Sequence, residues 1–251
     1  MTSTYITEWT QGAIDIQDCY WYHGYDFTKH VPGIEPDYYL EDSLEHFLLP
    51  PDMTGRTFLD VGTASGYLSF TMEKRGAEVV SFDLSPEEAP DQIPYWNADD
   101  RSQYNEEHWA QLRRSYWYAH RHFDSRAKAV YGNILNMPEG LGTFDVAMIG
   151  SVLQHVRDPF LAIQQVDAHT KDTLIICEAH FPSKDPVIVF QAEPEASQPQ
   201  FWTWWRMSSA FLVQAMKVLG YRDVVVTKPF DLDHVRCGFK VRSVTVKGRK
   251  G

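Results

Sequence analysis

The sequence predicts an α/β fold with a mostly parallel sheet and helices on both faces. Two short apolar runs, at 57–61 and 77–82, have the length and the flanking residues of buried strands, and the first ends at Gly62. Residues 67–74, between them, have helical character. A strand, a glycine-containing turn, a helix and a second strand within about 30 residues form a βαβ unit, and this unit requires parallel strands.

The rest of the chain continues the alternation of strands and helices. Five further strands are predicted from apolar runs at 127–131, 144–149, 173–177, 224–226 and 235–246. Together with the first two runs they predict a seven-stranded sheet. The Pro- and Asp-rich residues 84–103 are predicted to form a loop.

Three more helices are predicted after the first βαβ unit. Asp158 followed by Pro159 is typical of an N-cap and a first helical turn, and Ser208 can cap a helix that stops near Gly220. A helix at 106–123 is predicted from apolar and aromatic residues that recur at steps of three and four, namely Trp109, Leu112, Tyr116, His120 and Phe123.

The first 50 residues differ from the rest, because they are aromatic and irregular. Residues 39–48 predict a short amphipathic helix, which Pro50 and Pro51 end. We expect residues 1–50 to form an extension that packs over the active site, and residues 51–251 to form the ligand-binding domain.

Composition narrows the function classes. The chain of 251 residues carries a formal net charge of −11, which argues against a nucleic-acid partner because phosphate backbones are bound mainly by Lys and Arg. No apolar run is long enough for a membrane span, and the N-terminus lacks the pattern of a signal peptide. Three scattered cysteines predict neither a disulfide framework nor a zinc site. We therefore expect a cytoplasmic protein with no metal and no membrane contact.

The sharpest local signal is the turn after the first strand, in the run FLDVGTASGY at 58–67. Gly62 and Gly66 let the backbone approach a ligand closely beside a helix N-terminus. The second strand is followed by Asp83, and an acid there can accept hydrogen bonds from both hydroxyls of a ribose. The dinucleotide pattern G-x-G-x-x-G is broken at Ala64 and Tyr67, whereas D-x-G-x-x-x-G is the pattern of S-adenosylmethionine sites.

With these motifs in order, the chain from Trp21 to Val246 resembles the class I S-adenosylmethionine-dependent methyltransferases, whose fold is Rossmann-like. The family's first motif commonly reads LDxGxGxG, so Ala64 is a departure from it. The runs WYH at 21–23, LGTFDVAMIGSVLQHVRDP at 141–159 and FWTWWRMSS at 201–209 resemble one subgroup, which is described as similar to tRNA wobble-uridine (carboxy)methyltransferases.

The resemblance implies S-adenosylmethionine as the cofactor and gives each binding residue a role. Asp60, Gly62, Ala64 and Gly66 would surround the methionine part, and Asp83 would hold the ribose. Asn133 and Ile134 would flank the adenine, where the family more often has Asp. Ser151 and Val152 would line the floor of the cofactor pocket.

Methyl transfer needs a general base only if the acceptor must lose a proton. His155, after the fourth strand, is the first candidate for the catalytic base, and Glu178, after the fifth, is the second. The alternative for His155 is packing at the start of the following helix, and for Glu178 a structural role. Contacts with the acceptor are expected from aromatic residues outside the sheet, namely Trp21, Tyr22, His23, Trp204 and Trp205.

Three functions stay open at this level. The first is methylation of a small-molecule acceptor, an aromatic or apolar intermediate of secondary metabolism. The second is a tRNA wobble-uridine (carboxy)methyltransferase, which the charge of the chain disfavours. The third is a non-enzymatic ligand-binding regulator, which the intact turn disfavours. The acceptor atom is left open, and the aromatic N-terminus is compatible with a homodimer.

Overall fold

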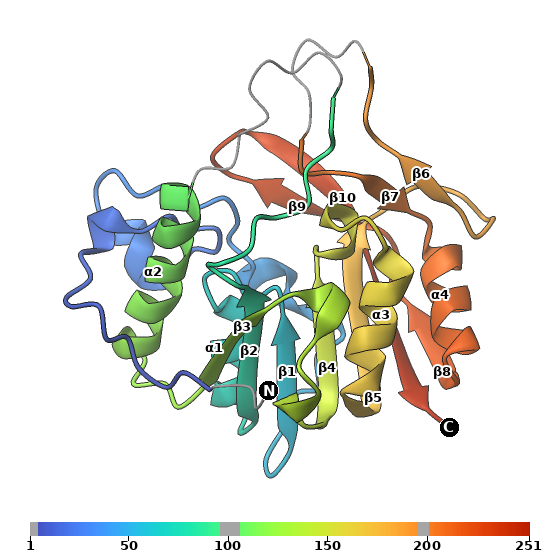
Figure 1. The fold of residues 1–251 in the computed structure, drawn as a ribbon, viewed down its shortest axis with the longest axis horizontal. Coiled ribbons are helices and arrows are strands. Elements are labelled where there is room, and N and C mark those ends of the chain that lie inside the picture. Colours follow the sequence, from blue (N-terminus) through green and yellow to red (C-terminus); the bar gives the residue numbers. More distant parts are fainter. Residues whose placement is uncertain (1–4, 96–105, 195–200) are drawn as a thin grey trace.

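An eight-stranded sheet forms the centre of the molecule in the computed structural model, which describes residues 5–95, 106–194 and 201–251 (Figure 1). Its strands are β1 (Thr57–Val61), β2 (Glu78–Leu84), β3 (Lys128–Gly132), β4 (Phe144–Gly150), β5 (Thr170–Ala179), β8 (Tyr221–Val226), β9 (Phe230–His234) and β10 (Phe239–Lys250). A separate two-stranded sheet is made of β6 (Ile188–Phe190) and β7 (Trp205–Met207). The α-helices are α1 (Tyr67–Lys74), α2 (Glu106–His122), α3 (Pro159–Ala168) and α4 (Ser209–Val218).

The sheet is mostly parallel, as predicted. Its order is β3-β2-β1-β4-β5-β10-β8, and β9 pairs with β10 outside this path. The pairs from β3 to β5 are parallel, whereas β10 is antiparallel to β5, β8 and β9. The strand order reverses between β1 and β4, and the carboxyl ends of parallel strands at such a point are where ligands bind in open α/β sheets.

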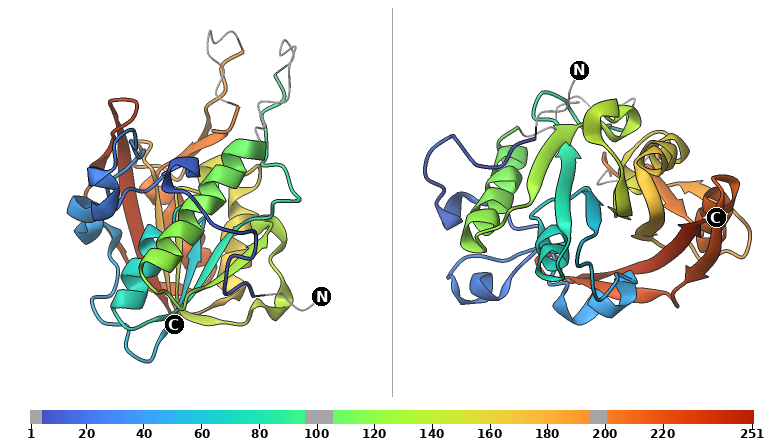
Figure 2. Two further views of the ribbon diagram at one scale, coloured as in Figure 1. Left: turned by 90° about the vertical axis from the view of Figure 1, so that its left-hand side faces the viewer. Right: turned by 90° about the horizontal axis from the view of Figure 1, so that it is seen from below.

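Helices cover both faces of the sheet, because successive strand residues point to opposite sides (Figure 2). Leu59 of β1 packs with the core under α3 and α4, and its neighbour Phe58 packs with the core under α1, α2 and the N-terminal segment. Both side chains are 0% exposed. The near-continuous apolar strands of the sequence are therefore explained by burial on two sides.

The predicted helix starts are confirmed. The carboxylate of Asp158 accepts the N–H of Leu161 at 2.9 Å, with Pro159 in the first turn of α3. The hydroxyl oxygen of Ser208 accepts the N–H of Phe211 at 3.1 Å at the start of α4, which ends just before Gly220.

Three sequence predictions need correction. The expected amphipathic helix at 39–48 is a 3₁₀ helix, Glu41–Phe47, because this short segment ends before two prolines and i→i+3 bonds suit runs of this kind. The last predicted strand, 235–246, is too early at its start, since residues 235–238 form the turn between β9 and β10. Of the predicted loop 84–103, Leu84 belongs to β2 and residues 96–103 lie outside the described residues.

The N-terminal segment is tied to the turn after β1 through Ser65. Its hydroxyl oxygen accepts the backbone N–H of Tyr22 at 3.1 Å and that of His23 at 3.3 Å, and the Ser115 hydroxyl of α2 donates to it at 2.9 Å. The hydroxyl of Tyr25 donates to the Ser65 carbonyl at 2.6 Å. The segment is thereby held against the carboxyl edge of the sheet.

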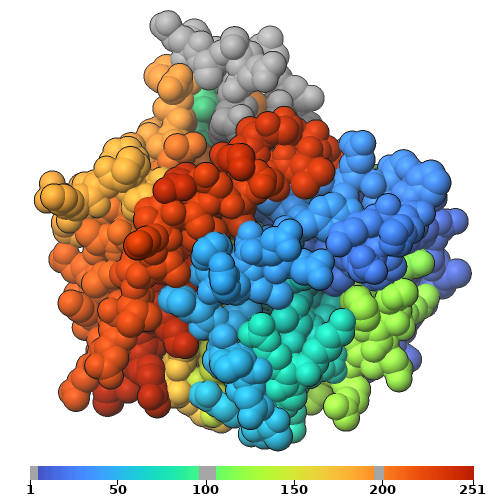
Figure 3. Space-filling model, turned by 180° about the vertical axis from the view of Figure 1, so that it is seen from behind, coloured from blue at the N-terminus to red at the C-terminus, as the bar shows by residue number. Residues whose placement is uncertain are grey.

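The same segment is joined to the β9–β10 hairpin, and Figure 3 shows the two lying side by side on the rear face. Asp37, only 3% exposed, accepts hydrogen bonds from Arg236 Nε at 2.7 Å and from the Tyr20 hydroxyl at 2.6 Å. Its carbonyl accepts the N–H of Val235 at 2.7 Å. This cluster of Tyr20, Asp37 and Arg236, the hairpin latch, fixes the hairpin beside the extension.

We expect Asp37→Ala to lower the free energy of unfolding by about 2 kcal/mol, because it removes two hydrogen bonds that involve a buried charge. The control is Asp233→Ala, which breaks an exposed ion pair with Lys240 in the same hairpin and should cost about 0.5 kcal/mol or less. Urea unfolding of the two variants measures the difference. Equal losses in both would show that the latch adds no stability.

Candidate cofactor and acceptor site

The turn between β1 and α1 is tight and takes left-handed backbone conformations at three positions. The φ angles are 79° at Gly62, 48° at Ala64 and 83° at Gly66. A Cβ on Gly62 would overlap the side chain of Val152. Ala64 takes a conformation that glycine adopts more easily, so the alanine that stands where the family motif has glycine is conformationally strained.

Asp60, at the end of β1, is the centre of a buried hydrogen-bond network. Its Oδ2 accepts the Thr63 hydroxyl at 2.9 Å, the Ser69 N–H at 3.1 Å and the Ser69 hydroxyl at 2.7 Å. Burial raises the pKa of Asp60 to about 6, although these hydrogen bonds favour the ionised form. A cationic ligand beside it would favour the carboxylate further.

A cavity of about 500 Å³ opens at the carboxyl ends of β1 and β4. Of the predicted cofactor residues, Asp60, Gly62 and Ser151 line it. Its volume lies in the range of small-molecule sites. The sheet's reversal point and this cavity therefore coincide.

A second, narrow pocket of about 10 Å³ lies around Asp83 and Ala64, and Thr63 lines both spaces. Asp83 accepts the backbone N–H of Ala64 and that of Leu84, each at 2.7 Å. Burial raises the pKa of Asp83, and these two backbone bonds oppose the shift.

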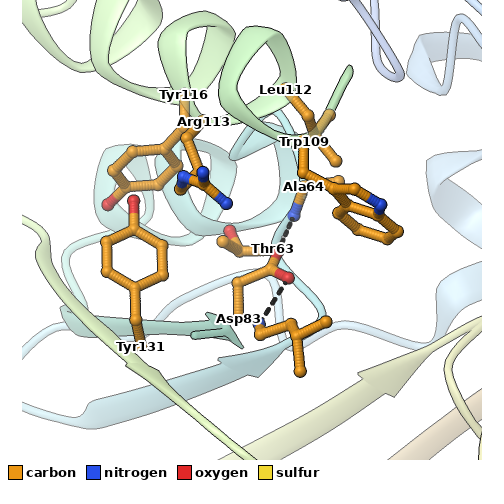
Figure 4. A pocket seen from close by; sticks show the side chains of 9 residues that line it. Thr63, Ala64, Asp83, Trp109, Leu112, Arg113, Tyr116 and Tyr131 are labelled. Carbon is orange, nitrogen blue, oxygen red and sulfur yellow. Dashed lines mark hydrogen bonds between the residues drawn. The ribbon is translucent and has the colours of Figure 1, made fainter. Parts of the chain in front are cut away.

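Figure 4 shows that side chains of α2 come down over this pocket, with Trp109 and Arg113 on the side opposite Asp83. A ribose is much larger than the space between them. A sugar bound at Asp83 would therefore have to displace the side chain of Trp109 or Arg113.

Four of the predicted cofactor residues line neither space. Gly66 caps the start of α1, and Val152 packs over Gly62. Ile134 is 8% exposed and belongs to the core under α3. Asn133 follows β3 as expected, but its amide oxygen accepts the N–H of Leu135 at 2.9 Å and its amide nitrogen donates to Glu88 at 2.6 Å.

His155 lines the cavity with a fixed tautomer. Its Nδ1 is 2.6 Å from the carbonyl oxygen of Trp202, and a carbonyl only accepts, so Nδ1 carries the proton. Burial lowers the pKa of His155, so the ring is neutral near pH 7 and Nε2 keeps a lone pair. This is the state that a general base requires.

Glu178 is fully buried and does not line the cavity. Its Oε1 accepts the backbone N–H of Val152 at 2.9 Å and that of Leu153 at 2.7 Å, at the 3₁₀ turn Leu153–His155. Burial raises the pKa of Glu178 to about 8. Its position fits support of the turn that carries His155 better than the catalytic role expected from the sequence.

The five aromatic residues expected at the acceptor divide into two groups. Tyr22 and His23 line the cavity, and burial lowers the pKa of His23 to about 3. Trp21 does not line it, because it is 1% exposed and packs edge-on against Tyr25 in the core.

The two tryptophans of the 201–209 run also lie outside the cavity lining. The indole N–H of Trp204 donates to Asp91 O at 3.3 Å, and that of Trp205 donates to Val156 O at 2.9 Å. Their neighbours Thr203 and Arg206 line the cavity instead. The expected acceptor contacts of Trp21, Trp204 and Trp205 therefore do not fit the structure, since all three side chains serve packing.

Several residues that line the large cavity were not predicted from the sequence. Leu40, Phe47 and Tyr38 come from the N-terminal segment, Gln154 comes from the 3₁₀ turn Leu153–His155, and His234 ends β9. Only the fold brings these residues together, and the aromatic content of residues 1–50 is a signal for those of them that lie in that segment.

Among the described residues, no three His, Cys, Asp or Glu side chains are grouped so that they could hold a metal ion. No helix in the described ranges is long and apolar enough to cross a membrane.

A family model described as a methyltransferase domain matches residues 30–220. A SAM-dependent methyltransferase from Methanosarcina mazei is similar in structure, with a TM-score of 0.55 and 18% identity over 85% of this chain and 98% of that one. The N-terminal domain of EvdMO1 with SAH bound has a TM-score of 0.53 and 17% identity, over 84% and 79% of the two chains. Magnesium protoporphyrin IX methyltransferase from Synechocystis PCC 6803 with bound SAM has a TM-score of 0.51 and 12% identity, over 84% and 78%. A search of the curated proteins gave no match.

If Asp83 holds the ribose, Asp83→Ala should weaken S-adenosylmethionine binding about 10- to 100-fold, the usual effect of losing hydrogen bonds to a charged group. Isothermal titration calorimetry measures the dissociation constant. The matched control is Asp145→Ala, because Asp145 also accepts two hydrogen bonds, both from Thr57. Asp145 lies near the amino end of β4, away from the carboxyl ends of the strands where the cavity opens. An unchanged affinity in Asp83→Ala would contradict this placement of the cofactor.

Proposed function

The chain belongs to the methyltransferase-domain family and is a methyltransferase, and from this premise we propose that it transfers a methyl group from S-adenosylmethionine to a small-molecule acceptor. The observation that carries the proposal is the cavity of about 500 Å³, which combines the turn after β1 with the neutral base His155. Structures of the same fold named above hold SAM or SAH, which supports the choice of cofactor.

In this proposal the methionine end of the cofactor lies at the turn after β1. The carboxylate of Asp60 attracts its ammonium group, and the bare backbone of Gly62 allows close approach. Ser151, in a left-handed conformation with a φ of 55°, presents its backbone to the same space. The ribose hydroxyls would bind Asp83 once the side chain of Trp109 or Arg113 has moved aside, and the adenine would lie beside Asn133 and Ile134.

The acceptor occupies the part of the cavity that the N-terminal segment and the β9–β10 hairpin enclose. Leu40, Phe47, Leu232, Phe239 and Val241 give this part an apolar surface. Such walls suit a flat or apolar ring, as expected for an intermediate of secondary metabolism. The share of the extension in this lining supports the division at residue 50, with residues 1–50 packed over the active site.

Transfer proceeds by in-line displacement at the methyl carbon. A lone pair of the acceptor atom forms the new bond to the methyl carbon, the carbon–sulfur bond breaks, and its electron pair returns to sulfur. Nε2 of His155 takes the proton that an oxygen or nitrogen acceptor releases. Most of the rate gain comes from holding the two reactants in line.

The other functions receive less support. A tRNA acceptor is disfavoured by the net charge of −11, and a purely regulatory role is disfavoured by a cavity that contains a neutral histidine with an available lone pair. A cytoplasmic location and a homodimer remain predictions.

We expect the protein to release S-adenosylhomocysteine from S-adenosylmethionine when it is given a pool of small phenols, amines and acids. A mass-spectrometric assay detects the product, with parallel reactions that contain bulk tRNA or no acceptor. Release only with the small molecules supports the proposal. Release only with tRNA would overturn it. So would a failure of every acceptor to raise release above the level of the acceptor-free reaction.

With an acceptor from that pool, we expect His155→Asn to lower kcat about 100- to 10,000-fold while S-adenosylmethionine still binds, because a general base contributes that much. The acid limb of kcat/KM should lie below pH 6.5, since burial lowers the pKa of His155 and protonation of Nε2 removes the base. Initial rates between pH 4.5 and 8.5 measure both effects.

Two further variants test the assignment of the base. His169→Asn is the matched control, because His169 makes the same kind of bond, from Nδ1 to Gly142 O at 2.6 Å, outside the cavity. Glu178→Gln should retain activity at pH 7, since Glu178 with a pKa of about 8 is protonated there. A loss of rate in Glu178→Gln with no loss in His155→Asn would assign the base to Glu178 instead.

A further inference from the structure

The charges that line the cavity are few. Among the described residues that line it, Asp60 is the one carboxylic acid and Arg206 is the one guanidinium. The ring of His23, which also lines the cavity, is kept neutral by burial, which lowers its pKa to about 3. If Asp60 serves the ammonium group of the cofactor, Arg206 is left as the cation available to the acceptor.

Arg206 faces the cavity because of the pairing of its strand. It is the middle residue of β7 and is paired with Val189 of β6. Its neighbours Trp205 and Met207 pack against the main core, and side chains alternate along a strand, so Arg206 points the other way. Trp205 and Met207 therefore anchor the strand in the core, and Arg206 between them is directed to the cavity.

Arg206 is one of six described arginines without a carboxylate at ion-pair distance, and of these six it is the one that lines the large cavity. In the described ranges, six arginines form ion pairs with carboxylates, namely Arg56, Arg114, Arg157, Arg236, Arg242 and Arg249. No carboxylate in those ranges lies within ion-pair distance of Arg206, although the chain has 34 acidic residues against 23 basic ones. A cation left unpaired at a cavity wall in an acidic protein is available to a ligand.

The segment that carries Arg206 is bonded to the segment that carries the proposed base. The Trp204 N–H donates to the carbonyl of Gln154 at 2.8 Å, next to the bond between His155 and the Trp202 carbonyl. These bonds hold the backbone that carries Arg206, an exposed side chain, beside the turn that carries His155. A molecule bound through an anionic group at Arg206 would lie in the cavity that His155 also lines.

We propose that Arg206 binds a carboxylate on the acceptor, so that the substrate is a small ring-containing acid. The planar guanidinium can donate two parallel hydrogen bonds to a carboxylate, and the apolar walls from the extension and the hairpin take the ring. This inference rests on the proposed function and names the substrate class of the same cavity.

The test uses matched pairs of probes with S-adenosylhomocysteine present at saturation. The pairs are 4-hydroxybenzoate with its methyl ester, and indole-3-carboxylate with indole-3-carboxamide. Calorimetric titration of the wild-type protein should show an acid that binds about 10-fold or more tightly than its neutral partner, as expected for a charge-assisted contact. Arg206→Gln should abolish this preference, and Arg206→Lys should retain part of it.

Arg242→Gln is the control, because Arg242 pairs with Asp231 in the hairpin and does not line the cavity. It should keep the preference for the acid. No preference in the wild-type protein, or an unchanged preference in Arg206→Gln, would overturn the inference.

A titration of each variant with S-adenosylmethionine shows whether Arg206 binds the carboxylate of the acceptor or the methionine carboxylate of the cofactor. Weaker cofactor binding in Arg206→Gln, with acid binding unchanged, would assign Arg206 to the methionine carboxylate and overturn the inference. Acid binding that depends on Arg206 in a protein that releases no S-adenosylhomocysteine with any acceptor would leave the inference standing and overturn the proposed function.

Discussion

The turn between β1 and α1 determines most of the site. Three residues in five take left-handed conformations there, and the side chain of Val152 leaves no room for a Cβ on Gly62. The turn uses its polar groups in three directions, since Asp60 binds Ser69 beneath it, Ala64 donates to Asp83 beside it, and Ser65 accepts from the N-terminal segment above it. A shift of this backbone would therefore move both the predicted cofactor residues and the N-terminal segment, whose Tyr22 and His23 line the cavity.

Burial rather than ion pairing sets the protonation states around the cavity. It raises the pKa of Asp60 to about 6 and that of Glu178 to about 8, and it lowers the pKa of His23 to about 3 and that of His155. Near neutral pH His23, His155 and Glu178 are thus uncharged. In the proposed function, a cationic cofactor would meet no imidazolium charge from His23 or His155, and Nε2 of His155 would be able to accept a proton.

The parts of the structure that local patterns determine could be predicted from the sequence. The parallel strands have a clear apolar pattern because both of their faces are buried, and caps such as Asp158 and Ser208 act within three residues. The pattern at 39–48 predicts a short amphipathic helix but not its 3₁₀ type, because both helix types expose one face over so short a segment. The cavity lining depends on contacts between distant segments, such as Asp37 with Arg236, for which a single sequence holds no signal.

The run 201–209 shows how such a prediction fails at the level of single residues. Tryptophans are large and suit a binding wall, but on β7 the alternation gives the core to Trp205 and Met207 and the cavity to Arg206. The direction of that alternation follows from pairing with β6 and from the bond between Trp202 O and His155, neither of which composition reveals. The aromatic residues of this run therefore hold the segment in place, and the smaller or charged residues between them are the ones in position to contact an acceptor. In the proposed function, substitutions at Thr203 and Arg206 would therefore change the binding of the acceptor and leave the turn after β1 as it is.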